Sequence, residues 1–165
     1  MSKIFLGLIA FTLIFGIGCA KKQIIKPEVI AHPVTEAKTD IDEASVRFKD
    51  WTAVQELENV NFDYESYDLT SSAAEVLKKN AGYLKDYPTL SIIVEGYCDQ
   101  RGTVEYNLAL GQKRASAVRN YYITLGIPAN SIGTISYGKE KLIDESDNDT
   151  AYSKNRRAET KVRGK

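Results

Sequence analysis

The pattern of apolar and polar positions divides the chain into an N-terminal apolar run, a polar stretch, and a module with helix and strand periodicities. Residues 4–17 are almost wholly apolar and follow one basic residue, Lys3. This run is too short to cross a bilayer, which needs about 20 apolar residues, and it matches the hydrophobic region of a secretory signal. We therefore predict that residues 1–18 form a signal peptide. No later apolar run in the sequence approaches the length of a membrane-spanning helix.

The apolar run ends in Gly16-Ile17-Gly18-Cys19, with small residues directly before a cysteine. This arrangement resembles the cleavage box of bacterial lipoproteins, although Gly16 stands where that class usually has leucine. The resemblance implies that Cys19 is acylated, and stable membrane anchoring requires more than one acyl chain. Ala20 follows the cysteine, which in sorting systems of the enteric type implies transfer to the outer membrane. Ordinary signal cleavage, with Cys19 incidental, is the alternative.

The stretch between the signal and the module is predicted to be a tether. Residues 19–43 contain Pro27 and Pro33, alternate lysine with acidic residues, and lack the apolar spacing of a helix. Residues 44–58 are predicted to form a short helix or a linker. We expect Trp51 in this segment to dock on the surface of the domain that follows.

The module itself covers residues 59–163. Residues 60–64 alternate apolar and polar positions, as expected for a strand with one buried face. Residues 70–72 are three candidate N-caps for a helix, and Glu75 has capping-box spacing from Ser72. Further elements are predicted as strands at 90–94, 132–137 and 157–162, a helix at 107–125 and a turn at 151–154. This βαβαββ order predicts an α/β (α+β) sandwich, with the helices on one face of a mixed four-stranded sheet.

Composition narrows the possible functions. The chain has 22 Lys and Arg residues against 22 Asp and Glu residues, so its formal net charge is zero and nucleic-acid binding is not expected. One histidine and two cysteines exclude a zinc site built from these residue types and leave few groups for a catalytic triad. We predict no metal, no cofactor and no nucleic-acid partner.

Three segments of the module carry a family resemblance. Residues 94–115 include Gly-Tyr-Cys-Asp-Gln-Arg-Gly followed by Asn-Leu-Ala-Leu-Gly-Gln-Lys-Arg-Ala, and residues 136–141 and 151–158 read Ser-Tyr-Gly-Lys-Glu-Lys and Ala-Tyr-Ser-Lys-Asn-Arg-Arg-Ala. Together they resemble the OmpA-like C-terminal domain family, and within it the group of peptidoglycan-associated lipoproteins. The resemblance covers roughly residues 60–162. Cys98 and Leu142 depart from the usual pattern, which has a small residue and a proline there.

The resemblance implies a function and a set of site residues. It implies an outer-membrane lipoprotein whose domain faces the periplasm, binds peptidoglycan non-covalently through diaminopimelate, has no catalytic activity, and takes a Tol-system periplasmic protein as partner. The peptidoglycan-binding residues carried over by position are Glu65, Tyr67, Asp99, Arg101, Leu110 and Arg114.

The chemistry of such a ligand agrees with these residue types. The free end of diaminopimelate is a zwitterion, so a site for it needs a fixed anion and a fixed cation, preferably a planar guanidinium. We expect Asp99 to hold the ammonium with help from Glu65, and Arg114 to hold the carboxylate, both at solvent-facing positions. The alternative is that Asp99 merely pairs with Arg101 while Arg114 is a solvated helix residue.

Other interpretations stay open at the level of sequence. Glu65 and Asp99 could be paired carboxylates of a wall hydrolase, or the module could be a scaffold that contacts only proteins. Cys98 fits a small buried residue better than a redox-sensitive thiol. Residues 156 and 157, both arginine, fit pairing with sheet carboxylates better than an anionic-glycan patch.

Overall fold

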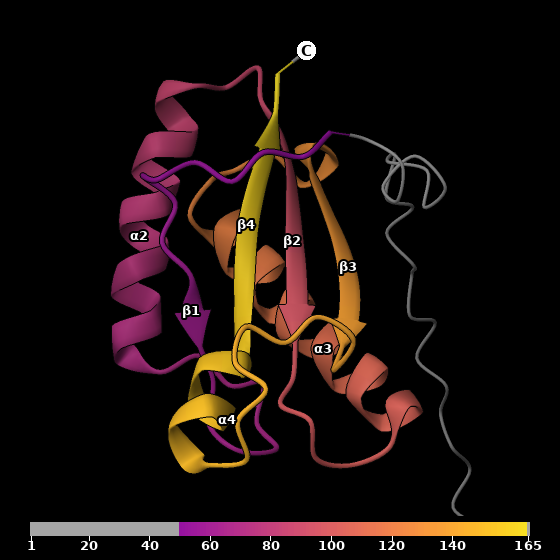
Figure 1. The fold of residues 1–165 in the computed structure, drawn as a ribbon. Coiled ribbons are helices and arrows are strands. Elements are labelled where there is room, and N and C mark those ends of the chain that lie inside the picture. Colours follow the sequence, from indigo (N-terminus) through magenta and orange to yellow (C-terminus); the bar gives the residue numbers. More distant parts are fainter. Residues whose placement is uncertain (1–49, 165) are drawn as a thin grey trace, which may run out of the picture. The chain divides into compact units, whose positions relative to one another are not determined.

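The computed structural model describes residues 50–164 (Figure 1). The predicted signal peptide, Cys19 and the tether lie outside the described residues. Among residues 50–164, no helix is both long enough and apolar enough to cross a membrane. In chain order the elements are β1 (Val60–Asn61), α2 (Ser71–Asp86), β2 (Ser91–Tyr97), α3 (Val104–Thr124), a 3₁₀ turn (Ala129–Ser131), β3 (Ile132–Gly138), α4 (Asp149–Asn155) and β4 (Arg157–Arg163).

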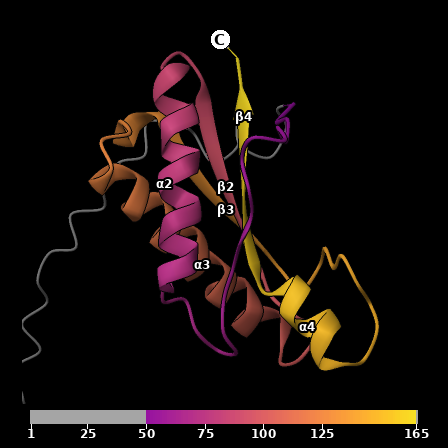
Figure 2. The same cartoon turned by 90° about the vertical axis from the view of Figure 1, so that its left-hand side faces the viewer.

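The strands form one mixed sheet in the order β1-β4-β2-β3. Strands β2 and β3 run parallel, whereas β4 is antiparallel to both of its neighbours, β2 and β1. Helices α2 and α3 lie on the same side of this sheet, and α4 lies at its end (Figure 2). The predicted fold class is therefore confirmed.

Three element boundaries differ most from the prediction, and β2 also ends three residues later than predicted, at Tyr97. Strand β1 has two residues instead of five, α3 begins at Val104 instead of residue 107, and the predicted turn near 151–154 is the helix α4. Side-chain caps set both helix starts. Thr103 Oγ1 accepts a hydrogen bond from the backbone N–H of Tyr106, and Asn148 Oδ1 accepts one from Ala151. Both caps are residue types that favour helix starts, and they place these starts earlier than the apolar spacing predicts. Thr70 is the cap that α2 uses, one of the three candidates.

The helix-covered face of the sheet carries the main core. Every second side chain of β2 and β4 points toward the helices. These side chains pack against the apolar faces of α2 and α3. The buried cluster includes Ile92, Val94, Ala158 and Val162 from the strands with Leu77, Ala81, Ala115 and Val118 from the helices.

The opposite face carries a smaller cluster and receives the segment before β1. Ile93 and Ile135 are buried there, with Trp51 and Tyr137 packed against them. Thr52 pairs with Val162 through two backbone hydrogen bonds of 2.9 and 3.0 Å. The docking of Trp51 is confirmed. In the described part of the predicted helix, residues 50–58 are extended and turning rather than helical: the Thr52 backbone pairs with Val162 of β4, and Leu57 N–H donates to the Val54 carbonyl in a turn.

Two glycines let α3 lie directly on β2. A Cβ atom at Gly96 would clash with the backbone carbonyl of Gly111, and one at Gly111 would clash with the Ser136 hydroxyl. Only glycine allows this approach of a helix to a strand. The contact sets the position of α3 relative to the end of β2, which is where the candidate site lies.

Candidate functional site

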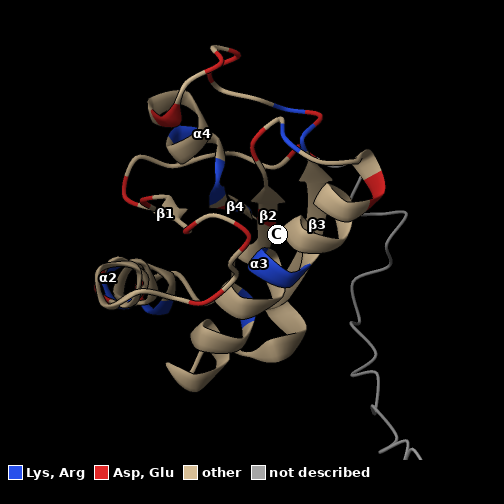
Figure 3. Cartoon of the chain, turned by 90° about the horizontal axis from the view of Figure 1, so that it is seen from below, with Lys and Arg blue, Asp and Glu red and all other residues tan. Residues whose placement is uncertain are grey.

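A cleft with an empty volume of about 300 Å³ opens where β2 ends and α3 begins. Seen from this end of the molecule, acidic and basic residues gather on the surrounding loops (Figure 3). Three arginines and two acids line the cleft together with uncharged residues. The lining consists of Tyr64, Glu65, Cys98, Asp99, Arg101, Gly102, Tyr106, Asn107, Leu110, Arg114 and Arg156.

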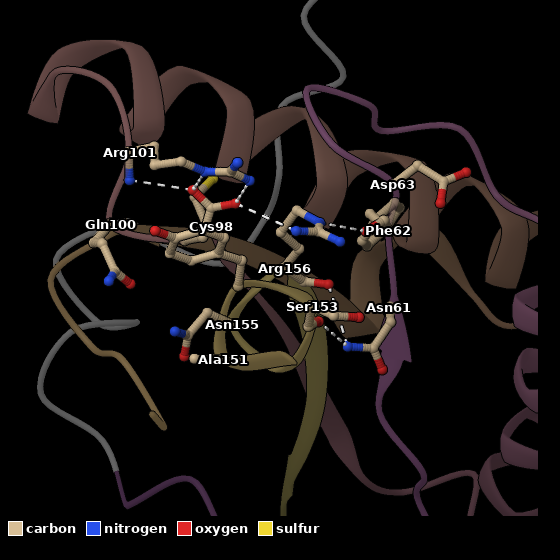
Figure 4. Close-up of polar contacts among 12 residues, drawn as sticks. Asn61, Phe62, Asp63, Cys98, Gln100, Arg101, Ala151, Ser153, Asn155 and Arg156 are labelled. Carbon is tan, nitrogen blue, oxygen red and sulfur yellow. Dashed lines mark hydrogen bonds and ion pairs between the residues drawn. The ribbon is translucent and has the colours of Figure 1, made fainter. Parts of the chain in front are cut away.

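Asp99 is the central anion of the cleft and is only 4% exposed. Its Oδ1 accepts hydrogen bonds from the backbone N–H and the Nε of Arg101, at 3.1 and 3.2 Å, and its Oδ2 lies 2.7 Å from Arg101 Nη2. Arg156 Nη1 approaches Oδ2 more loosely, at 3.5 Å, so both guanidiniums converge on one carboxylate (Figure 4). Burial by itself would raise the pKa of Asp99, but the hydrogen bonds and charge of Arg101 and the contact with Arg156 outweigh it and hold the pKa below its usual value. Asp99 is therefore a fixed carboxylate.

Arg101 is held between two aromatic rings. Its guanidinium carbon lies 4.2 Å from the ring centroid of Tyr64 and 4.1 Å from that of Tyr152. The hydrogen bond to Asp99 raises the pKa of Arg101. Since its side chain is 36% exposed, Arg101 can meet a ligand while it remains stacked.

Side-chain hydrogen bonds hold the loop between Asp99 and α3 in place. Asn107 Nδ2 donates to the carbonyls of Arg101 and Thr103 at 2.7 and 3.0 Å, and Lys139 Nζ donates to the carbonyl of Gly102 at 2.6 Å. Gly102 has a φ of 83°, a left-handed conformation that favours glycine. The charged groups of the cleft thus stand on a loop with a defined backbone.

Arg114 lies deeper than expected. It is fully buried, and its Nε, Nη1 and Nη2 donate to the carbonyls of Ser66, Tyr97 and Asp63 at 2.8, 2.9 and 3.1 Å. Burial lowers its pKa, but an arginine keeps its charge in proteins. The prediction that Asp99 and Arg114 face solvent is wrong for both. The alternative of a solvated Arg114 is also wrong, because its guanidinium holds the β1–α2 loop against the end of β2.

Arg156 belongs to the cleft, so the prediction that it pairs with a sheet carboxylate is wrong. Its Nε donates to the carbonyl of Phe62 at 2.9 Å, and its side chain is 15% exposed. The expected pairing with a sheet carboxylate holds for the next residue, since Arg157 Nε lies 2.7 Å from Glu159 Oε1. The position of Arg156 at the C-cap of α4, one residue before β4, could have indicated that it does not share the sheet alternation.

The other predicted site residues fall into two groups. Leu110 and Glu65 line the cleft, the latter exposed and with a φ of 53°, a conformation that non-glycine residues rarely adopt. Tyr67 does not line the cleft; it is 45% exposed, with Lys113 Nζ 5.3 Å from its ring centroid. The structure therefore brings together five of the six predicted residues, and adds Tyr64 and Arg156.

Cys98 contributes to the wall of the cleft rather than to its chemistry. The residue is 2% exposed, and its thiol lies 3.4 Å from both the Asn107 carbonyl oxygen and Arg114 Nη1. Burial raises the pKa of the thiol, which disfavours the reactive thiolate. This arrangement favours the small buried residue over the redox-sensitive thiol. Within residues 50–164, no group of three or more His, Cys, Asp or Glu side chains could hold a metal ion.

Comparison with known proteins identifies the family of this chain. The profile of the OmpA family matches residues 61–156. The peptidoglycan-associated lipoprotein of Brucella melitensis is 46% identical over 107 residues, which cover 65% of this chain and 64% of that protein. The peptidoglycan-associated lipoprotein of Haemophilus influenzae is 45% identical over 104 residues, 63% of this chain and 68% of that protein. The chain thus spans slightly less than two thirds of the Brucella protein.

Solved structures lead to the same family. The crystal structure of the peptidoglycan-associated lipoprotein from Burkholderia pseudomallei shares 40% identity, covers 64% of this chain and 89% of that one, and has a TM-score of 0.62. The C-terminal domain of Helicobacter pylori MotB, at 22% identity, covers 66% of this chain and 85% of that one, with a TM-score of 0.61, and shares the fold alone. The chain belongs to the OmpA family and is similar to its peptidoglycan-associated lipoproteins.

Proposed function

We propose that this chain is a lipoprotein, anchored in the outer membrane through Cys19, whose domain faces the periplasm and binds peptidoglycan at the cleft around Asp99. It thereby tethers the outer membrane to the cell wall, in a Tol-type system with a Tol periplasmic protein as partner. The names of the relatives support peptidoglycan association. The ligand group is the zwitterionic end of diaminopimelate in the stem peptide.

The observation that carries this proposal is the charge arrangement of the cleft. Three cations, Arg101, Arg114 and Arg156, stand against two anions, Asp99 and Glu65, so the lining has a surplus of one positive charge. A ligand that brings an ammonium alone would increase this surplus. A ligand with both an ammonium and a carboxylate on one carbon satisfies the anion and the cations together.

The contact distances indicate how the ligand enters. The contact of Asp99 with Arg156, at 3.5 Å, is longer than its contacts with Arg101. We infer that the ligand ammonium replaces Arg156 at Asp99, and that the Arg156 guanidinium, still held by the Phe62 carbonyl, takes the ligand carboxylate together with Arg101. Arg114 forms the floor of the cleft, because its donors are occupied by backbone carbonyls.

The carboxylates do not fit a hydrolase. A glycosidase needs a general acid whose pKa is raised, so that it holds a proton near neutral pH. The pKa of Asp99 is lowered instead, because arginine side chains surround it. We propose binding without catalysis.

Co-sedimentation with purified sacculi tests the proposal. The parent protein should bind, and a soluble peptide containing diaminopimelate should compete, whereas the same peptide with lysine in that position should compete poorly because it lacks the distal carboxylate. Asp99→Asn should weaken binding by about 30-fold or more, the effect of removing one charge of a desolvated pair. Lys85→Ala, an exposed change on α2, should have no effect. Full binding by a folded Asp99→Asn variant would leave the protein scaffold as the better hypothesis.

The anchor has its own test. Cys19→Ser should accumulate either as uncleaved precursor or as a soluble periplasmic form, because serine cannot receive the thioether-linked lipid. Cell fractionation and the mass of the mature N-terminus distinguish these forms. Recovery of a mature Cys19→Ser protein in the membrane fraction would contradict acylation at this position.

A further inference from the structure

Large exposed apolar side chains gather at the end of the domain that holds the cleft. Of the six such residues within the described part of the chain, five lie on loops or a helix start at the end where β2 and β3 finish (Figure 1). They are Tyr64, Tyr67, Val104, Tyr106 and Ile143. The sixth, Tyr87, is the C-cap of α2, at the other end of the sheet. Gathered exposed apolar residues are typical of a binding surface, whereas scattered ones need no explanation.

Two of these tyrosines belong to the cleft itself. Tyr64 comes from the loop after β1 and is 55% exposed, and Tyr106 comes from the first turn of α3 and is 47% exposed. Both therefore combine contact with the charged cleft and a large area open to solvent. A ligand that fills the cleft and continues outward meets these two rings.

Tyr64 is also preorganised. One face of its ring lies against Arg101, and Arg101 is fixed by its paired contacts with Asp99 and by Tyr152 on its other side. A ring held in this way loses little conformational entropy when it binds a ligand. The charged pair in the cleft thus holds an aromatic platform at its mouth.

We propose that Tyr64 and Tyr106 form a sugar-binding platform for the glycan strand of the wall polymer, beside the charged cleft. This inference rests on the proposed function and extends it from the stem peptide to the glycan. A pyranose ring presents a face of C–H groups that packs on an aromatic ring, while the tyrosine hydroxyl can bond sugar hydroxyls. The stem peptide separates diaminopimelate from its sugar by an alanine, a γ-linked glutamate and a lactyl group, which together span about 13 Å when extended. The sugar can thus reach the mouth of the cleft when diaminopimelate is inside. The side chain nearest the sugar in that peptide is a single methyl group, a poor match for two rings.

Two soluble ligands separate sugar contact from peptide contact. The full-length protein in detergent is titrated calorimetrically with a free stem peptide containing diaminopimelate, and with the same peptide attached to the N-acetylglucosamine–N-acetylmuramic acid disaccharide. The parent should bind the disaccharide-peptide more tightly. Tyr106→Ala should weaken the disaccharide-peptide by about 3- to 10-fold and the free peptide by a smaller factor, whereas Tyr64→Ala, which also releases Arg101, should weaken both ligands and the disaccharide-peptide more strongly. Tyr64→Phe, which keeps the ring, should retain most of the affinity.

The controls make the inference refutable. Tyr87→Ala, an equally exposed tyrosine at the other end of the sheet, should bind both ligands as the parent does. Because Tyr64→Ala also releases Arg101, Tyr106→Ala is the stricter variant, and urea unfolding verifies that both are folded. Equal losses of affinity for both ligands would show that the tyrosine rings contact the peptide and not the sugar. Unchanged affinity for both would show that the rings do not bind the ligand. Either result overturns the inference. Asp99→Asn should lose both ligands, so a failure of the cleft itself gives a different pattern from a failure of the platform.

Discussion

Two groups of charged residues in this domain have a similarly buried central acid but differ in charge balance. The cleft cluster consists of Asp99, Arg101, Arg114 and Arg156. The sheet-face cluster lies on the face of the sheet away from α2 and α3 and consists of Glu95, Arg157, Glu159 and Lys161. Asp99 and Glu95, the central acids of the two clusters, are 4% and 3% exposed. Burial alone therefore does not distinguish a binding group from a structural one.

In the sheet-face cluster the charges balance and pair with one another. Lys161 Nζ lies 2.6 Å from Glu95 Oε2 and 3.5 Å from Glu159 Oε2, and Arg157 Nε lies 2.7 Å from Glu159 Oε1. Glu95 and Glu159 are direct partners in the β2–β4 register, where like charges repel, so the lysine bridge compensates for this pairing. The Tyr97 hydroxyl donates a further hydrogen bond to Glu95. Two anions and two cations leave no charge for a ligand.

In the cleft cluster the positive and negative charges do not balance. The guanidiniums of Arg101 and Arg156 contact the Asp99 carboxylate, and with Arg114 and Glu65 included the lining retains a surplus positive charge. Buried charges are costly unless they are paired, so guanidinium donors that the cleft's own carboxylates do not satisfy can pair with the carboxylate of a ligand. The comparison teaches that the two clusters differ in charge balance and not in the burial of their central acids, and this difference supports the cleft as the proposed site.

The largest expected effect comes from Arg114. Arg114→Ala leaves three carbonyls without their charged donor and should lower the free energy of unfolding by about 3–5 kcal/mol. Arg157→Ala on the sheet face should lower it by about 1–3 kcal/mol, because Glu159 keeps Lys161 as a partner. Urea denaturation at pH 7 measures both, with Lys85→Ala as the neutral control. If Arg114→Ala lowers the free energy of unfolding no more than Lys85→Ala does, the buried contacts of Arg114 do not stabilise the domain.

The next effect separates binding from stability. Asp99→Asn should reduce the affinity for sacculi by about 30-fold or more, whereas Glu95→Gln should leave that affinity unchanged. Each substitution removes one buried negative charge from an isosteric side chain, so the pair is closely matched. Co-sedimentation isotherms of the two variants measure the difference. Comparable losses of affinity in both would mean that the charge surplus is not what identifies the site.

A smaller effect is expected on the stability of the sheet face. Glu95→Gln weakens the bonds from Lys161 and Tyr97 and should lower the free energy of unfolding by about 1–2 kcal/mol. Lys161→Met combined with Glu95→Gln should cost less than the sum of the single changes, because both remove the same ion pair. Strict additivity in urea denaturation would argue against a direct coupling of the two residues.

The smallest effect distinguishes the clusters by pH. The folded pKa of Asp99 lies below its usual 3.8, so its stabilisation is present above that value and is lost as the pH falls through the folded pKa. For Lys161 burial would lower the pKa, but the bonds and charges of Glu95 and Glu159 outweigh it and raise the pKa above 10.5. Its stabilisation is therefore complete below pH 10.5 and is lost as the pH rises through the folded pKa.

Unfolding free energies measured across pH test this assignment. Asp99→Asn should reduce the acid dependence and leave the alkaline limb intact, and Lys161→Met should do the reverse. An alkaline limb that persists unchanged in Lys161→Met would assign it to another group.

The sequence by itself determined most of the elements and five of the residues that line the cleft. Period-two and helical patterns depend on neighbours a few positions apart, so they indicated the strands, the helices and the mixed sheet with its helices on one side. The resemblance of residues 94–115 to the OmpA-like family implied Asp99, Arg101, Leu110 and Arg114 together, and these residues lie at short separations along the chain.

Only the tertiary structure decided how deeply these residues are buried and what they contact. The depth of Arg114 depends on carbonyls at Asp63, Ser66 and Tyr97, up to 51 positions away in the sequence. Arg156 reaches Asp99 across 57 positions, and no local pattern indicates that contact. Residues 50–58 are not helical in the structure, and within them Thr52 pairs with Val162 of β4. Side-chain burial and charge balance arise from contacts between distant segments, which is why the sequence could identify the cleft residues but not which of them bind and which support the fold.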